Sequence, residues 1–164
     1  MKKIIGVIGS DSLLPEKVTA IAEKIGGEIA QRGFVLMCGG RGGVMEAACR
    51  GAKHHNGLTV GILPSLDKSQ ANVHVDVAIP TSLGYARNSI VASGPDVTIA
   101  IAGSAGTLSE IALALNYKKP VVIVESSGGI SGEVRKLTLD REYARLIHFA
   151  TPEQAVETAA RLIE

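Results

Sequence analysis

The sequence has no tryptophan and few aromatic residues of any kind. Aromatic side chains make up 3% of the 164 residues, so the base-stacking surfaces on which single-strand nucleic-acid binders depend are nearly absent. An excess of one charge is lacking too, because the formal net charge is +1, and this gives no field strong enough to hold nucleic acid through its phosphates. We therefore expect no nucleic-acid partner and a core built from Ile, Val, Leu and Ala.

Cysteines and long apolar runs are also scarce. Cys38 and Cys49 match neither a CxxC metal pair nor a disulfide framework, so we expect reduced, packed thiols and no metal site. The first apolar run, from Ile4 to Gly9, is shorter than the roughly 7–15-residue core of a signal peptide. No run approaches the length of a membrane span. These absences predict a cytoplasmic protein without a membrane partner.

Apolar runs alternate with helical patterns along the whole chain. Its length falls within the roughly 100–200 residues of one domain, which predicts a single domain over residues 1–164. We expect strands over residues 4–8, 34–38, 58–63, 75–79, 97–102 and 121–124, and helices over 16–32, 44–55, 85–93, 108–117 and 152–163. Such alternation predicts βαβ units, and hence an α/β, Rossmann-like, doubly wound and mainly parallel sheet flanked by helices on both faces.

A repeated glycine pattern is the most informative feature. Residues 39–46 read GGRGGVME and residues 103–110 read GSAGTLSE, so both fit G-x-x-G-x-x-x-E. Each copy follows an apolar strand and opens a helix, where free N–H groups and the positive end of the helix dipole attract anions. We therefore predict a phosphate-bearing small molecule at these loops. The predicted contacts are Gly39, Gly40, Gly42, Gly43, Glu46, Gly103, Ser104, Gly106, Thr107 and Glu110.

The first strand-to-helix turn adds Gly9 and Ser10 as candidates. The turn reads GSDS instead of the G-x-G-x-x-G of nicotinamide-binding proteins, and Ser10 either donates to a ligand or caps the next helix. No Lys-Ser or Lys-Thr pair follows either glycine loop, so neither is a Walker A loop. Triphosphate hydrolysis and nicotinamide-dependent hydride transfer are therefore disfavoured.

Arg87 and Glu110 each have two interpretations. Arg87 stands at the start of an expected helix, whose positive end repels it unless an anion is near; the alternative is a salt bridge to Glu46 or Glu110. The segment from Thr107 to Glu110 has the S/T-x-x-E form of a capping box, in which Glu110 only satisfies a helix amide. Otherwise, its carboxylate hydrogen-bonds ribose or stabilises positive charge at an anomeric carbon. Asn88, directly after Arg87, is a further binding candidate.

Residues 126–132, SSGGISG, interrupt the alternation directly after an expected strand. A segment so rich in glycine and serine does not hold a packed conformation by itself. Two interpretations stay open: a mobile flap that orders over the site when ligand binds, and an ordinary solvated connection.

Several segments, taken in order, resemble one known family. These are CGG at 38–40, GVME at 43–46, GILP at 61–64, ARN at 86–88 and the second glycine loop, and together they resemble the Rossmann-like molybdenum-cofactor carrier proteins. That family is a branch of the superfamily of the Lonely Guy phosphoribohydrolases, long misnamed lysine decarboxylases, and of more distant nucleotide-sensing and DNA-processing proteins. The resemblance implies a nucleotide or a phosphorylated, molybdopterin-type cofactor as ligand, and a homo-oligomer, either a dimer or a tetramer.

The Lonely Guy branch implies a second function. Its signature P-G-G-x-G-T-x-x-E provides a Glu that, with an earlier Arg, supports cleavage of the N-glycosidic bond of nucleoside 5′-monophosphates. By that resemblance Arg87 and Glu110 hold the catalytic places, with Gly103, Gly106 and Thr107 on the phosphate.

The match to that signature has three departures. Ala102 replaces its Pro, Ser104 replaces its second Gly, and Asn88 follows Arg87 where those enzymes have Lys. Two hypotheses therefore stay open: a binding or carrier protein for a nucleotide-like ligand, and a phosphoribohydrolase that releases a base and ribose 5-phosphate.

Overall fold

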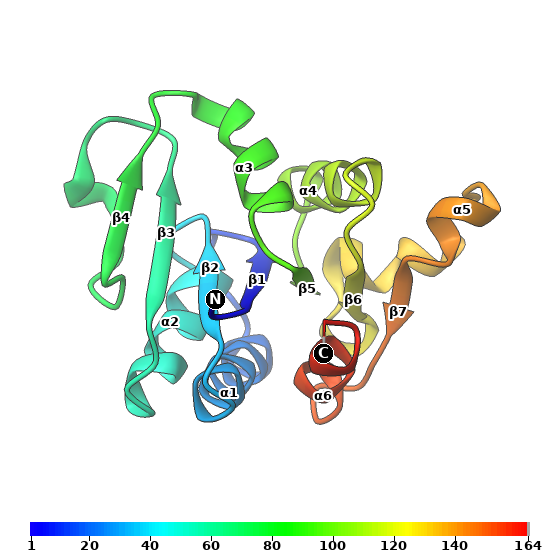
Figure 1. The fold of residues 1–164 in the computed structure, drawn as a ribbon, viewed down its shortest axis with the longest axis horizontal. Helices are drawn as coiled ribbons and strands as arrows, with labels where there is room; N and C mark the ends of the chain where they lie inside the picture. Colours follow the sequence, from blue (N-terminus) through cyan, green and yellow to red (C-terminus); the bar gives the residue numbers. More distant parts are fainter. Residues whose placement is uncertain (164) are drawn as a thin grey trace.

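A seven-stranded sheet in the order β4-β3-β2-β1-β5-β6-β7 forms the centre of the computed structural model, which describes residues 1–163. Every neighbouring pair of strands is parallel, and Figure 1 shows helices in front of and behind the sheet. The Rossmann-like α/β fold expected from the sequence is confirmed. The strands are β1 (Ile4–Gly9), β2 (Val35–Cys38), β3 (Thr59–Leu63), β4 (Val77–Pro80), β5 (Val97–Ile101), β6 (Val121–Val124) and β7 (Ile147–Phe149).

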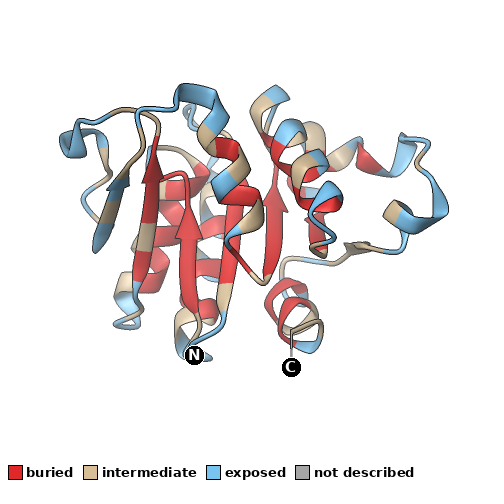
Figure 2. Ribbon diagram, turned by 45° about the horizontal axis from the view of Figure 1, so that its top comes forward, coloured by how far each residue is buried: buried red, intermediate tan, exposed pale blue. Residues whose placement is uncertain are grey.

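The helices divide between the two faces of the sheet. Successive strand side chains point to opposite faces, so Val7 of β1 packs against α1, α2 and α6, whereas Ile8 packs against α3 and α4. Figure 2 shows the central strands buried and the β4 edge largely exposed. The helices are α1 (Glu16–Gln31), α2 (Val44–His54), α3 (Asn88–Ser93), α4 (Ala105–Asn116), α5 (Arg141–Ala144) and α6 (Ala155–Arg161).

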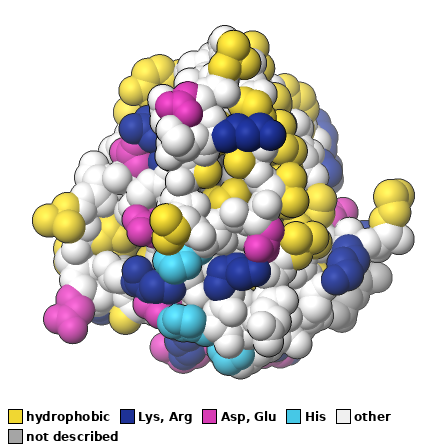
Figure 3. Space-filling model, turned by 90° about the vertical axis from the view of Figure 1, so that its left-hand side faces the viewer, with side chains coloured by type: hydrophobic (Ala, Val, Ile, Leu, Met, Phe, Trp, Pro, Cys, Tyr) yellow, Lys and Arg dark blue, Asp and Glu magenta, His cyan; other side chains and the backbone are white. Residues whose placement is uncertain are grey.

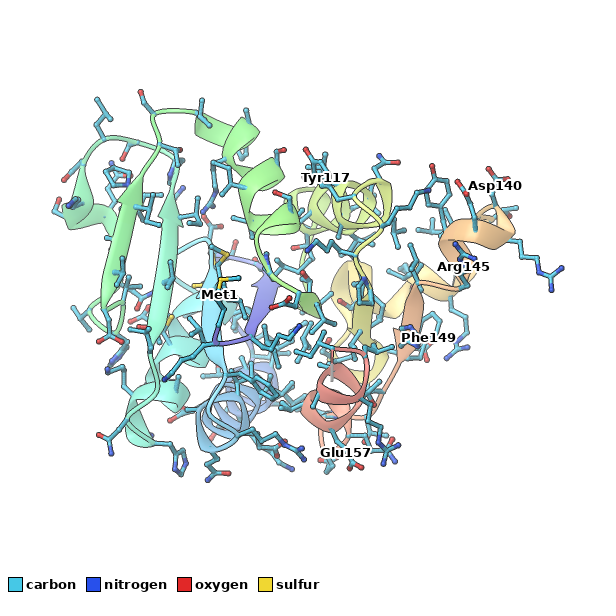
Figure 4. All side chains as sticks on the ribbon, viewed as in Figure 1. Met1, Tyr117, Asp140, Arg145, Phe149 and Glu157 are labelled. Carbon is cyan, nitrogen blue, oxygen red and sulfur yellow. The ribbon has the colours of Figure 1, made fainter. Side chains whose placement is uncertain are left out.

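Two elements, α5 and β7, were not expected from the sequence. Strand β7 is a short edge strand whose three residues are only half-buried, so it lacks the continuous apolar run of the central strands. Phe149, labelled on β7 in Figure 4, packs under the guanidinium of Arg135, 3.8 Å from the ring centroid. The expected helix over 85–93 also divides, into a 3-10 turn (Gly84–Arg87) followed by α3.

Cys38 and Cys49 are buried free thiols whose sulfur atoms lie 3.6 Å apart, in the core between β2 and α2. Among residues 1–163, no helix is long and apolar enough to cross a membrane.

The strand order positions the site. The chain moves outward from β1 to β4 on one side and then returns to β5 beside β1, continuing to β7 on the other side. In open parallel sheets a crevice forms outside the carboxyl ends of the strands at such a reversal, and ligands bind there. The reversal lies between β1 and β5.

Candidate functional site

A cleft of about 760 Å³ lies beyond the carboxyl ends of β1 and β5. This volume is within the range of small-molecule sites. The predicted residues on its wall are Gly9, Ser10, Arg87, Asn88, Ser104, Gly106, Thr107 and Glu110. The structure thus gathers both members of the catalytic pair implied by the Lonely Guy resemblance and most of the second glycine loop in one place.

The first turn of α4 presents unpaired donors to this cleft. Helix α4 begins at Ala105, and the N–H groups of Ala105, Gly106 and Thr107 have no acceptor among the described residues. The first intrahelical bond in this turn is donated by Leu108 to the carbonyl of Ser104 at 3.0 Å. Three convergent amides at the positive end of a helix form an anion site when they face a cleft that excludes bulk water.

Gly106 lines the cleft and has open space where a side chain would be. A Cβ added there would meet no heavy atom within 4 Å, and its φ is not in the left-handed region. Glycine within a helix is less favourable than alanine by roughly 1 kcal/mol. Neither sterics nor backbone conformation therefore requires a glycine at position 106.

Glu110 lies in the second turn of α4 and is not a cap. The helix begins three residues earlier than expected, its N-cap Ser104 makes no side-chain cap bond, and so the capping-box interpretation is wrong. The side chain is 7% exposed. Burial raises the pKa of Glu110 from 4.5 to about 7, although nearby Arg87 opposes this shift. Glu110 lines the cleft, so its carboxyl group is open to a hydrogen-bond partner there.

Arg87 ties the ends of two strands together at the cleft wall. Its Nη1 donates to the carbonyl oxygens of Gly39, after β2, and Ile62, in β3. No ion pair joins it to Glu46 or Glu110 among the described residues, so the salt-bridge alternative is wrong. Burial lowers the pKa of Arg87 while Glu110 raises it. The guanidinium also carries a positive charge at the cleft wall, and its remaining N–H donors can bind an anion there.

Asn88 connects α3 to the first turn of α4. Its Nδ2 donates to Ser109 Oγ at 3.0 Å, and that hydroxyl donates to the carbonyl of Gly106 at 2.7 Å. Asn88 is buried. It therefore acts on the position of the α4 turn through Ser109 as well as lining the cleft.

The first glycine loop packs against the protein instead of opening into this cleft. Gly39 lies against the Arg87 guanidinium, Gly40 lies against the backbone of Gly61, and Gly43, at φ +60°, lies against the carbonyl of Ser10. Gly42 and Glu46 border a separate hollow of about 370 Å³ with Arg50. The predicted contacts Gly39, Gly40, Gly42, Gly43 and Glu46 therefore do not lie on the main cleft wall.

The segment 126–132 is fixed to the end of β5 by two buried serines, while Ser126, Gly128 and Gly129 are exposed. Ser127 and Ser131 are buried and hydrogen-bond the backbone of Ala102, at the end of β5. Isoleucine 130 also donates its N–H to the carbonyl of Gly103 at 3.0 Å. The segment lies behind the second glycine loop and does not line the cleft.

Sequence reasoning missed several cleft residues. The exposed Tyr85 and the apolar Met45 and Leu113 also line the cleft, and Asp11 and Ser109 add polar groups. The sequence offered one signal for two of them: Tyr85 and Ser109 stand within two residues of the predicted site residues Arg87 and Glu110. The ring of Tyr85 and the apolar side chains provide surface for a flat ring system.

Fold and cleft together define a Rossmann-like protein with a helix N-terminus of free amides at the sheet's reversal point. The chain belongs to the SLOG cluster4 family, whose model matches residues 2–156.

Solved structures with high similarity span nearly the whole chain. The molybdenum cofactor binding protein from Rippkaea orientalis is 39% identical, with a TM-score of 0.88 over 100% of this chain and 99% of that one. The Moco carrier protein of Chlamydomonas reinhardtii is 38% identical, with a TM-score of 0.86 over 99% and 98%.

A more distant relative is an enzyme. The cytokinin riboside 5′-monophosphate phosphoribohydrolase of Mycobacterium tuberculosis is 31% identical over 121 residues, which cover 68% of this chain and 65% of that protein.

Proposed function

We propose that this protein binds a nucleotide or a phosphorylated, nucleotide-like cofactor, with its phosphate on the amides of Ala105, Gly106 and Thr107. The observation that carries the proposal is Gly106, which lines the cleft and has no protein contact that requires a glycine. A side chain at this position would stand between a phosphate and the amides.

The remainder of the ligand contacts the other residues that line the cleft. Met45, Tyr85 and Leu113 offer an apolar surface to a heterocycle, while the buried carboxylate of Glu110 accepts from a hydroxyl or ring N–H. The names of the structural relatives favour a molybdopterin-type ligand, and these donors and acceptors fit its phosphate and its polar ring edge. The proposed role is that of a carrier, which binds and releases the ligand unchanged.

Native mass spectrometry of the freshly purified protein tests the carrier proposal, because a retained cofactor reports its own mass. A matched titration with AMP, followed by thermal unfolding, tests the phosphate site, since a ligand that binds only the folded state raises the unfolding temperature. We expect wild type and Gly42→Ala to be stabilised alike and Gly106→Ala to show no response. An equal response of all three proteins would contradict the assignment of the site.

Phosphoribohydrolase activity is the second candidate, favoured by the placement of Glu110 beside Arg87 at the cleft wall. In this reaction water adds to the anomeric carbon as the N-glycosidic bond breaks, and the base leaves with a proton. A carboxylate near that carbon stabilises the positive charge that develops in the transition state.

Glu110→Gln separates the two candidates. If the protein is a hydrolase, wild type should release free base and ribose 5-phosphate from AMP, GMP or CMP. The variant should then be slower by about 100-fold or more. Binding without any base release by wild type is the result expected of a carrier.

The proposed assembly is a homo-oligomer, a dimer or a tetramer. Support comes from large apolar side chains at the surface of the β4 edge and of the connection into α3. Figure 3 shows hydrophobic groups among charged ones on this face, with the His side chains in its lower part. The exposed residues are Val77, Ile79, Leu83, Tyr85 and Ile90. Light scattering on the eluting protein measures the state directly, and a monomer at micromolar concentration contradicts it.

A further inference from the structure

The turn that aims α4 into the cleft contains an unfavourable backbone conformation. Ala102 has φ +50° and Gly103 has φ +89°. The left-handed region is disfavoured for alanine, because its Cβ crowds the neighbouring carbonyl. Such a residue keeps this conformation only where the surrounding structure determines it.

Residues 127–131 supply bonds that hold this conformation. The N–H of Ala102 donates to Ser127 Oγ at 2.7 Å, and Ser127 Oγ in turn donates to the carbonyl of Val124. The carbonyl of Ala102 accepts from Ser131 Oγ at 2.9 Å and from the Ser131 N–H at 3.1 Å. Both polar groups of Ala102 are therefore fixed by buried serines.

Close packing adds a second constraint on the same turn. A Cβ at Gly129 would lie 2.6 Å from the carbonyl oxygen of Gly103, and Gly129 has φ +56°. The carbonyl of Gly103 accepts the N–H of Ile130. Residues 127–131 thus fix both turn residues from behind, away from the cleft.

We infer that Ser127 and Ser131 are positioning residues for the anion site, acting through Ala102 and Gly103 on the amides of residues 105–107. This inference rests on the proposed function, because it explains how the phosphate site is pre-organised. Neither serine lines the cleft. Precise placement of binding groups depends on such supporting contacts.

The test compares Ser127→Ala and Ser131→Ala with Thr59→Val. Thr59 is a matched control, because its buried hydroxyl donates to the carbonyl of His74 at 2.7 Å, far from the turn. Calorimetric titration with inorganic phosphate and with AMP should give about tenfold weaker binding for each serine variant, the scale seen when supporting contacts are lost. Thr59→Val should bind like wild type. Equal affinity in all variants, or equal losses in Thr59→Val and the serine variants, would overturn the inference.

A second variant separates positioning from loss of stability. Glycine adopts positive φ without strain, so adding Ala102→Gly to Ser131→Ala should restore most of the lost affinity. Failure to restore any affinity would overturn the proposed route through Ala102.

A ligand-free readout keeps this test independent of the proposed function. In ¹H–¹⁵N spectra, the amide resonances of Gly103 and Gly106 should move in both serine variants and stay in place in Thr59→Val. Unchanged resonances overturn the inference, whether or not wild type binds phosphate. Absence of binding by wild type, together with moved resonances, would contradict the proposed function and leave the inference supported.

Discussion

Two loops share one sequence pattern in this protein and make different contacts. In the loop after β2, three glycines lie against the protein's own atoms: the Arg87 guanidinium, the backbone of Gly61 and the carbonyl of Ser10. Gly42, the counterpart of Gly106 in the motif, borders a separate hollow. In the loop after β5, Gly106 faces open space at the cleft wall. Internal packing explains Gly39, Gly40 and Gly43, whereas the protein itself supplies no such reason for Gly106. The repeated glycine motif alone does not tell the two loops apart, whereas the structure shows that only the second lines the main cleft.

Gly43→Ala should give the largest loss of stability. A Cβ at Gly43 would overlap the carbonyl of Ser10, and its φ of +60° is strained for alanine. We expect the free energy of unfolding to fall by about 3 kcal/mol or more, from overpacking and strain together. Urea unfolding measures it. A loss below 1 kcal/mol would contradict the claim that packing explains the first loop.

The carboxylates that end the two motifs should differ in their effect on pH dependence. The pKa of Glu110 is raised from 4.5 to about 7, so the folded state holds a proton that the unfolded state loses. Its protonation favours folding fully below pH 4.5, and this advantage is lost as pH rises to about 7. The shift corresponds to about 3 kcal/mol.

Glu110→Gln should remove this pH dependence. Urea unfolding at pH 5 and pH 8 should show that wild type loses stability relative to the variant as pH rises. Glu46→Gln, the counterpart in the first motif, is the matched control. Parallel pH profiles for wild type and Glu110→Gln would contradict the burial of Glu110.

Replacement of Arg87 should affect both regions, because its side chain contacts the first loop and also lines the cleft. Arg87→Met leaves the carbonyls of Gly39 and Ile62 without their donor, which costs about 2 kcal/mol of stability. The same change should weaken AMP binding, because the cation at the cleft wall is lost. Arg87→Lys keeps the positive charge. Compared with Arg87→Met, it should therefore recover more of the AMP affinity than of the free energy of unfolding. Identical losses of both properties in the two variants would show that the charge has no separate role.

Gly106→Ala should have the smallest effect on stability. Alanine is the better helix former by roughly 1 kcal/mol, and no atom within 4 Å obstructs its Cβ. The free energy of unfolding should stay unchanged or rise by up to about 1 kcal/mol, while phosphate binding is lost. A destabilised variant that still binds AMP would reverse the contrast between the loops.

The sequence was sufficient to predict the elements that have strong local signals. The alternation of apolar runs with helical patterns predicted the Rossmann-like sheet, which the structure confirms. The glycines after β5 predicted a loop between a strand and a helix, and the structure places this loop at the reversal point of the sheet. Strand β7 was missed because its three half-buried residues lack such a run. The start of α4 was misplaced because Thr107 and Glu110 imitate a capping box. The bonds from Ser127 and Ser131 to Ala102 join residues 25 and 29 positions apart, and no local pattern encodes them.

An NMR titration with AMP compares the two loops most directly. Backbone ¹H–¹⁵N resonances are followed in one sample as the ligand is added. The account predicts saturable shifts largest at the amides of Ala105, Gly106 and Thr107, with much smaller shifts at Gly40 and Gly42. Shifts concentrated in the first loop, or none in either loop, would contradict the claim that the turn after β5 holds the phosphate.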